Sequence, residues 1–247
     1  SGGYDSSCVT ALLQTNSTEK IKTFTIGTTD NKLDEAPHAQ AIAQHLGTDH
    51  TEYYCTPKEA LDIIPELPHY YDEPFADSSA IPTILVSRLA RKKVTVALSA
   101  DAGDEIFAGY NRYDYISRYG NKLRSIPRPL RKMAAATMER VSSESIPFLR
   151  DQYNFHSRYD KLKNLLNDPS PSELLKNLSQ VFNRKDLQNL FAVDVRELPT
   201  AHDSKELKDE FFDPLSYMMA IDYQTYMVDD ILQKVDRATM SVSLEGR

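Results

Sequence analysis

The first seven residues, Ser-Gly-Gly-Tyr-Asp-Ser-Ser, combine residue types that can bind an anion. Gly2 and Gly3 let backbone N–H groups approach phosphate, because neither residue carries a Cβ. The serine hydroxyls add donors, and the apolar residues within 9–13 predict a helix whose positive N-terminal end favours an anion. Asp5 suits such a site only if a cation, usually Mg²⁺, joins its carboxylate to phosphate oxygens. The alternative is a Gly-Ser turn that opens an ordinary helix, and the loop alone does not decide between them.

A second acidic loop follows the segment 94–98, whose β-branched residues are typical of a short buried strand. This loop carries Asp101, Asp104 and Glu105 among small residues. Ligands of open α/β sheets bind at the carboxyl ends of strands. Two small-residue loops that bear acids therefore favour a site for a nucleotide and a metal ion.

These segments resemble the synthetase domain of the asparagine synthetase family, within the wider group of ATP pyrophosphatases. The first loop is shared with NAD, GMP and argininosuccinate synthetases and does not separate them. Motifs of the family also match residues 71–74, 98–105, 234–240 and 243–247. The resemblance thus extends over nearly the whole chain, and the later motifs separate this family from the other synthetases.

The resemblance implies a set of nucleotide-binding residues. ATP and pyrophosphate would be bound by Ser1, Gly2, Gly3, Asp5, Ser6, Ser7, Ser99 and Ala100, with Ile26 beside the adenine. Asp5 and Asp104 would hold Mg²⁺, which takes one or two protein carboxylates together with phosphates. The alternative for either aspartate is a turn in which the carboxylate accepts hydrogen bonds from its own loop.

Asp101 matches the acidic residue of the family that acts on the acyl-adenylate step. Related β-lactam synthetases carry Tyr there, so the resemblance favours amidation by ammonia over ring closure; the alternative is a surface carboxylate. The family pattern is broken by alanines in place of glycine at Ala100, Ala102 and Ala108. A Cβ at these positions matters if the backbone φ is positive.

Asp230 and Lys234 belong to a charged group near the end of the sequence. On a helix their i,i+4 spacing allows an ion pair. Two interpretations stay open for this pair: an exposed salt bridge, worth under about 1 kcal/mol, or a wall of the substrate site.

The function implied by the resemblance is ATP-dependent amidation of a carboxylic acid through an acyl-AMP, with release of pyrophosphate. The first expectation is conversion of L-aspartate to L-asparagine, with ammonia delivered from glutamine by a separate upstream glutaminase domain. Amidation of a sugar or peptide carboxylate, or a nucleotide-binding module without catalysis, are the alternatives. In the family a strand leads into the first loop, and a lysine beyond the equivalent of Arg247 stabilises the oxyanion, so the resemblance implies a domain truncated at both ends.

Strands and helices predicted from the sequence must position these residues. Strand patterns at 21–27, 50–55 and 94–98 alternate with helical patterns at 34–46, 57–64 and 78–92. This alternation predicts an α/β fold with a doubly wound parallel sheet over residues 1–110. Proline-punctuated helical patterns over 111–247 predict a mostly helical second part. We expect one sheet in the first part and no long antiparallel sheet in the second.

Composition excludes several classes of protein. The net charge of −7 and the absence of a dense basic run argue against nucleic acid as a partner. Two cysteines give no disulfide framework, so a reduced, cytoplasmic protein is expected. No apolar run is long enough to span a bilayer, and no membrane partner is expected. These observations leave a homodimer open.

Overall fold

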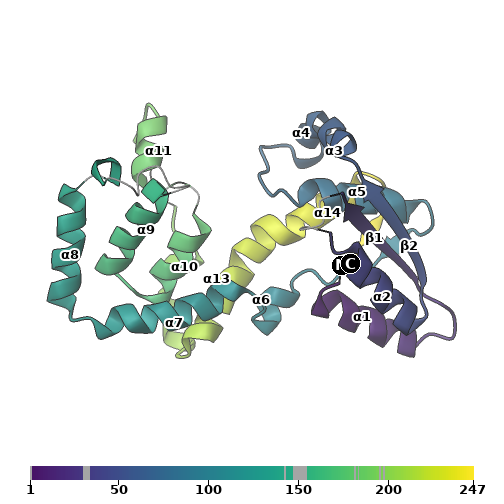
Figure 1. The fold of residues 1–247 in the computed structure, drawn as a ribbon, viewed down its shortest axis with the longest axis horizontal. Coiled ribbons are helices and arrows are strands. Elements are labelled where there is room, and N and C mark those ends of the chain that lie inside the picture. The colour runs from purple at the N-terminus through teal and green to yellow at the C-terminus, as the bar shows by residue number, and fades with distance from the viewer. Residues whose placement is uncertain are drawn as a thin grey trace. The chain divides into compact units, whose positions relative to one another are not determined.

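The computed structural model describes residues 2–29, 34–141, 143–146, 155–180, 182, 184–194, 196 and 198–247. Its contacts divide the chain into two compact units (Figure 1). Unit 1 comprises Ser1–Gly103 together with Tyr226–Arg247, and unit 2 comprises Asp104–Thr225. Among the described residues, no helix is long and apolar enough to cross a membrane.

Unit 1 begins with the predicted alternation of helices and strands. Its first four elements are α1 (Tyr4–Thr15), β1 (Lys22–Thr28), α2 (Ala36–Leu46) and β2 (Asp49–Cys55). β1 and β2 pair in parallel over their full length, from Lys22 opposite Asp49 to Thr28 opposite Cys55. Gly47 ends α2 in the left-handed region, at φ 72°. The predicted helices and strands of this segment are confirmed within a few residues.

The rest of unit 1 comes from two distant parts of the sequence. The first part contains α3 (Pro57–Ile63), η1 (Ile64–Glu66), α4 (Leu67–Tyr71), α5 (Ala80–Arg91) and β3 (Val96–Ala97). The second contains a π-helix, η4 (Met227–Leu232), then α14 (Gln233–Met240) and β4 (Glu245–Gly246). α14 packs against α5 and α4. The core between these helices is formed by Ile63, Tyr71, Ala80, Ile84 and Ala238.

The strands of unit 1 form two small parallel sheets. β3 pairs with β4, and this pair is separate from the sheet of β1 and β2. The mixed α/β class and the parallel direction of the strands agree with the prediction. A single doubly wound sheet is not observed in the described part of the chain. β4 was not predicted from sequence, because two residues are too few to show a strand periodicity.

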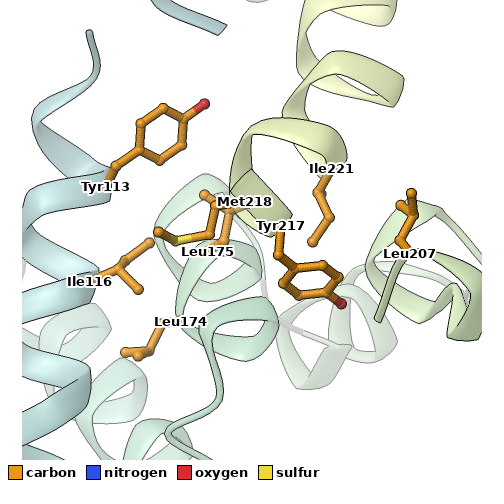
Figure 2. Close-up of a cluster of buried hydrophobic side chains, with 8 residues drawn as sticks. All are labelled: Tyr113, Ile116, Leu174, Leu175, Leu207, Tyr217, Met218 and Ile221. Atoms are coloured by element: carbon orange, nitrogen blue, oxygen red, sulfur yellow. The ribbon is translucent and has the colours of Figure 1, made fainter. Parts of the chain in front are cut away.

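All regular secondary structure in the described residues of unit 2 is helical. Its helices are α6 (Gly103–Phe107, starting at the unit boundary), α7 (Asn111–Ser125), α8 (Arg128–Arg140), η2 (Ser143–Ser145), α9 (Phe155–Asn167), α10 (Pro171–Ser179), α11 (Arg184–Leu190), η3 (Ala201–Asp203), α12 (Lys205–Glu210) and α13 (Pro214–Gln224). Figure 2 shows the core where α7, α10, α12 and α13 meet. Its members are Tyr113, Ile116, Leu174, Leu175, Leu207, Tyr217, Met218 and Ile221.

A buried ion pair adds to this core. Asp222, only 1% exposed, accepts a hydrogen bond of 2.8 Å from Arg112 and one of 2.6 Å from the Tyr113 hydroxyl. Burial, together with the hydrogen bond to Asp222, raises the pKa of Tyr113. The guanidinium of Arg112 also lies 4.1 Å from the centre of the Tyr110 ring. These contacts join α7 to α13 within unit 2.

Candidate functional site

The first loop leads directly into α1. Gly3 is the N-cap residue of α1 in extended conformation, and no described side chain caps this helix end. The hydroxyls of Ser6 and Ser7 donate to the carbonyl of Gly3, at 3.2 Å and 2.6 Å. The first turn of α1 directs its backbone N–H groups toward this loop, and the N-terminal end of a helix is a common place for an anion to bind.

The second loop follows β3 and is held to the end of the chain. The amide of Ser99 donates to the carbonyl of Arg247 at 2.8 Å, and the amide of Gly103 to that of Ala100 at 3.2 Å. Ala102 has φ 72°, and Ala108 in unit 2 has φ 59°. Both alanines thus occupy the left-handed region that favours glycine. Ala100 is not among the described residues with positive φ.

The two loops meet at Asp5 and Gly103. A Cβ added at Gly103 would lie 2.8 Å from the Cγ of Asp5 and 3.0 Å from its Oδ2. Only glycine lets the backbone of the second loop approach the carboxylate this closely. The side chain of Asp5 therefore lies directly against the second loop.

A cavity of about 810 Å³ opens beside both loops. Seven residues predicted for the site line it: Gly3, Asp5, Ser6, Ser7, Ser99, Ala100 and Asp101. The Asp101 side chain is exposed to solvent. The structure thus brings together, within unit 1, small residues, hydroxyls and two carboxylates that were predicted from distant sequence segments.

Other predicted residues lie elsewhere. Ser1 lies outside the described residues, and Gly2 packs against His38 of α2. Ile26 is in β1 and does not line the cavity. Asp104 belongs to unit 2, so its pairing with Asp5 around Mg²⁺ stays a prediction. In the described part of the chain, no group of three or more His, Cys, Asp or Glu is arranged to hold a metal ion.

Lys234 has a partner that the sequence analysis missed. Its Nζ donates to Oδ2 of Asp77 at 3.0 Å and to the hydroxyl of Ser79 at 2.8 Å. Asp77 also accepts hydrogen bonds from the amide and the hydroxyl of Ser79, just before α5. The ion pair expected between Asp230 and Lys234 is therefore formed with Asp77 instead. Asp77 forms a turn in which its carboxylate accepts from the amide two residues later, and an Asp-x-Ser sequence is a turn signal that could have identified it.

Asp230 lies near this ion pair, on the π-helix η4. π-helical turns occur frequently at functional sites. Burial and then the negative charge of Asp77 raise the pKa of Asp230. Burial also disfavours ionisation of Asp77, but the hydrogen bonds from Ser79 and Lys234 outweigh it and lower the pKa of Asp77. Burial and these two carboxylates raise the pKa of Tyr71, whose hydroxyl contacts the Lys234 carbonyl, to about 12.

Fold and site together define a class: an α/β protein with a Gly/Ser loop ahead of α1 and an acidic loop after β3. The sequence profile described as asparagine synthase matches residues 1–247. The chain therefore belongs to the asparagine synthase family.

Relatives of known name agree with this assignment. The chain is 29% identical over 252 residues to the glutamine-hydrolyzing asparagine synthetase 1 of Bacillus subtilis, covering all of the chain and 37% of that protein. It is 31% identical over 254 residues to a Mycobacterium tuberculosis protein provisionally named a glutamine-hydrolyzing asparagine synthetase, covering 36% of it. A Methanocaldococcus jannaschii protein with a similar provisional name is 39% identical over 133 residues, 51% of the chain and 26% of that protein. The chain spans little more than a third of the first two relatives.

Proposed function

We propose that this chain is the ATP-binding synthetase part of an enzyme that amidates a carboxylic acid. In the proposed reaction, the carboxylate attacks the α-phosphate of ATP and releases pyrophosphate, and ammonia then displaces AMP from the acyl-AMP. The observation that carries the proposal is the cavity shared by the two loops, with Asp5 against Gly103. Family membership supports the class of reaction.

The chain's residues contribute mainly by position and charge. The N-terminal end of α1, with Gly2 and Gly3, would bind the pyrophosphate through backbone N–H groups. Ser6 and Ser7 would add hydroxyls after turning away from the Gly3 carbonyl, and Ser99 with Ala100 would contact the nucleotide from the other side. Ile26, at the end of β1, would pack near the adenine.

Asp5 and Asp104 would hold Mg²⁺, which neutralises charge on the phosphates when bound. Carboxylate oxygens in a loop beside a phosphate site are the ligand type that Mg²⁺ prefers, so the donor set fits.

Asp101 would act in the second half of the reaction. Its exposed carboxylate lines the cavity and can accept a proton from the attacking ammonia. Such general-base catalysis contributes about 10²–10⁴-fold. Asp230 and Lys234 would form a wall of the acid site through their cluster with Asp77.

L-aspartate is the first candidate for the acid, because the relatives with full coverage carry the name asparagine synthetase. Glutamine would supply the ammonia through an upstream glutaminase domain, and the enzyme would be cytoplasmic. We also propose that the two parallel sheets, β1 with β2 and β3 with β4, belong to one doubly wound sheet.

ATP–pyrophosphate exchange, measured on the protein that contains this chain with a panel of carboxylic acids, tests adenylation. We expect exchange that depends on one acid, aspartate first. The variant Asp101→Asn should keep exchange while amide formation falls about 10²–10⁴-fold, and Asp101→Glu, which keeps a carboxylate, should lose less. Wild-type amide formation by Asp101→Asn would contradict the role of Asp101. ATP binding without exchange for any acid would favour the nucleotide-binding module.

A further inference from the structure

Asp104 lies at the start of a tight turn in unit 2, which runs along α6 and ends at Gly109. The amide of Gly109 donates to the carbonyl of Asp104 at 3.0 Å, and Ala108 has φ 59°. This is the Schellman pattern that ends many helices, with alanine at the position where glycine is usual. Strained backbone of this kind persists only where the surrounding contacts hold it, and it is common at ligand sites.

The turn brings the backbone of Gly109 against the side chain of Asp104. A Cβ added at Gly109 would clash with Oδ1 of Asp104 and would lie 3.0 Å from its Cγ. Gly109 is not among the described residues with positive φ, so its backbone conformation does not require glycine. The space that the Asp104 carboxylate occupies requires it instead. Any side chain at position 109 would therefore displace this carboxylate.

A buried hydrogen bond between side chains closes the same turn. The hydroxyl of Tyr110 donates to Oε1 of Glu105 at 2.6 Å, and Glu105 is only 2% exposed. Its neighbours Ile106 and Phe107 are 50% and 78% exposed. Carboxylates are rarely buried without a partner, and hydrophobic burial alone would place Phe107 inside. The orientation of α6 therefore follows the hydrogen bond between Glu105 and Tyr110.

Tyr110 is itself held by the helical core of unit 2. Its ring packs against this core and lies edge-on to the ring of Tyr113, with 5.7 Å between the ring centres. Figure 2 shows Tyr113 in the core. The guanidinium of Arg112 lies 4.1 Å from the centre of the Tyr110 ring, and Arg112 is paired with Asp222 of α13. Tyr110 thus connects the turn that begins at Asp104 to the core of unit 2.

We propose that Tyr110 and Gly109 are positioning residues for Asp104. This inference rests on the proposed function, in which Asp104 binds Mg²⁺. The hydroxyl of Tyr110 holds Glu105 and so holds the turn, and Gly109 leaves the room that the Asp104 carboxylate needs. Side chains that orient a metal ligand contribute about 10–100-fold to metal affinity, although they do not touch the metal.

Calorimetry with ATP, in the presence and in the absence of Mn²⁺, tests the proposal on the protein that contains this chain. Mn²⁺ takes the same carboxylate ligands as Mg²⁺. The ratio of the two ATP affinities reports how well the protein holds the metal ion. Tyr110→Phe and Gly109→Ala should each lower this ratio by about tenfold. In the metal-free protein, the amide of Gly109 should exchange faster with solvent in Tyr110→Phe, because the turn is held less firmly.

Each variant has a matched control in unit 2. Tyr113→Phe also removes a hydroxyl that donates to a buried carboxylate, that of Asp222. Gly120→Ala also adds a Cβ where space is short, 2.9 Å from Cδ1 of Leu174. Both controls should lower the thermal midpoint and leave the affinity ratio at its wild-type value. Asp104→Ala measures the full loss of this ligand.

The variants separate failure of this inference from failure of the proposed function. A wild-type ratio in Asp104→Ala would show that Asp104 does not hold the metal ion, and its proposed role and this inference would both be wrong. A lower ratio in Asp104→Ala, with wild-type ratios in Tyr110→Phe and Gly109→Ala, would overturn the positioning role alone. An equal decrease in Tyr113→Phe and Gly120→Ala would also overturn it, because general loss of stability would then explain the effect.

Discussion

Units 1 and 2 differ in how completely they fill their interiors. Unit 2 closes a core of eight buried apolar residues around four helices and adds a buried ion pair between α7 and α13. Unit 1 has a smaller core of five residues and a large cavity beside its two short sheets. Open clefts of this size that are lined by apolar side chains and a few polar groups are the usual form of ligand-binding sites. The proposed binding site therefore lies in unit 1, whereas unit 2 is distinguished by its packed helical core.

The largest effect is expected in unit 2 for Asp222→Ala. This variant leaves the Arg112 guanidinium without its buried carboxylate, which costs about 3–5 kcal/mol of unfolding free energy. Urea unfolding with hydrogen exchange should show the loss in α7 and α13. The matched control is Asp114→Ala, because Asp114 pairs with Arg118 on the surface and should cost under about 1 kcal/mol. Equal losses for both variants would contradict a special role for the buried pair.

In unit 1 the variant Lys234→Met removes one partner of the ion pair between Lys234 and Asp77. It leaves the carboxylates of Asp77 and Asp230 close together without the ammonium, so we expect a loss of about 2–3 kcal/mol. The loss should shrink in acid, where protonation removes the repulsion. Adding Asp77→Asn to Lys234→Met should restore part of the stability at pH 7. A loss that is independent of pH would indicate that only the packing of the lysine stem matters.

The sequence predicted the parts of the molecule that depend on local pattern. The alternation before residue 100 located α1, β1, α2 and β2, and the small residues located the two loops. The pairing of β3 with β4 depends on contacts between residues about 150 positions apart, and no local periodicity reports it. Lys234 forms its ion pair with Asp77 and not with Asp230, and this pairing likewise depends on how α5 packs against α14.

A smaller effect is expected for the strained alanines. Ala102→Gly in unit 1 and Ala108→Gly in unit 2 remove a Cβ from left-handed backbone, and each should raise stability by roughly 1 kcal/mol. Thermal unfolding measures both. A decrease for Ala102→Gly alone would show that its Cβ contributes packing beside the site.

The smallest effect is a pH dependence in unit 2. Burial lowers the pKa of His202 below 6.5, although the charge of Asp222 opposes this shift. Because the unfolded chain then binds more protons, stability is complete above pH 6.5 and falls as the pH drops through the native pKa. Hydrogen exchange in α10 and α13 between pH 7 and pH 5 should show the decline. The variant His202→Gln should lose this dependence of stability on pH. If the variant keeps the same dependence, carboxylates and not His202 cause it.

The pairing of β4 with β3 has a consequence for the order of events during synthesis on the ribosome. Unit 2 is one continuous stretch of chain, whereas unit 1 needs both Ser1–Gly103 and Tyr226–Arg247. Domains generally fold as their residues emerge, at about 5–20 residues per second. We therefore expect unit 2 to have folded before β4, the partner strand of β3, has been synthesised. During this interval the nascent first segment would leave the carbonyls of Thr95 and Ala97 without their partners at β4, so β3 would present an unpaired strand edge to other chains.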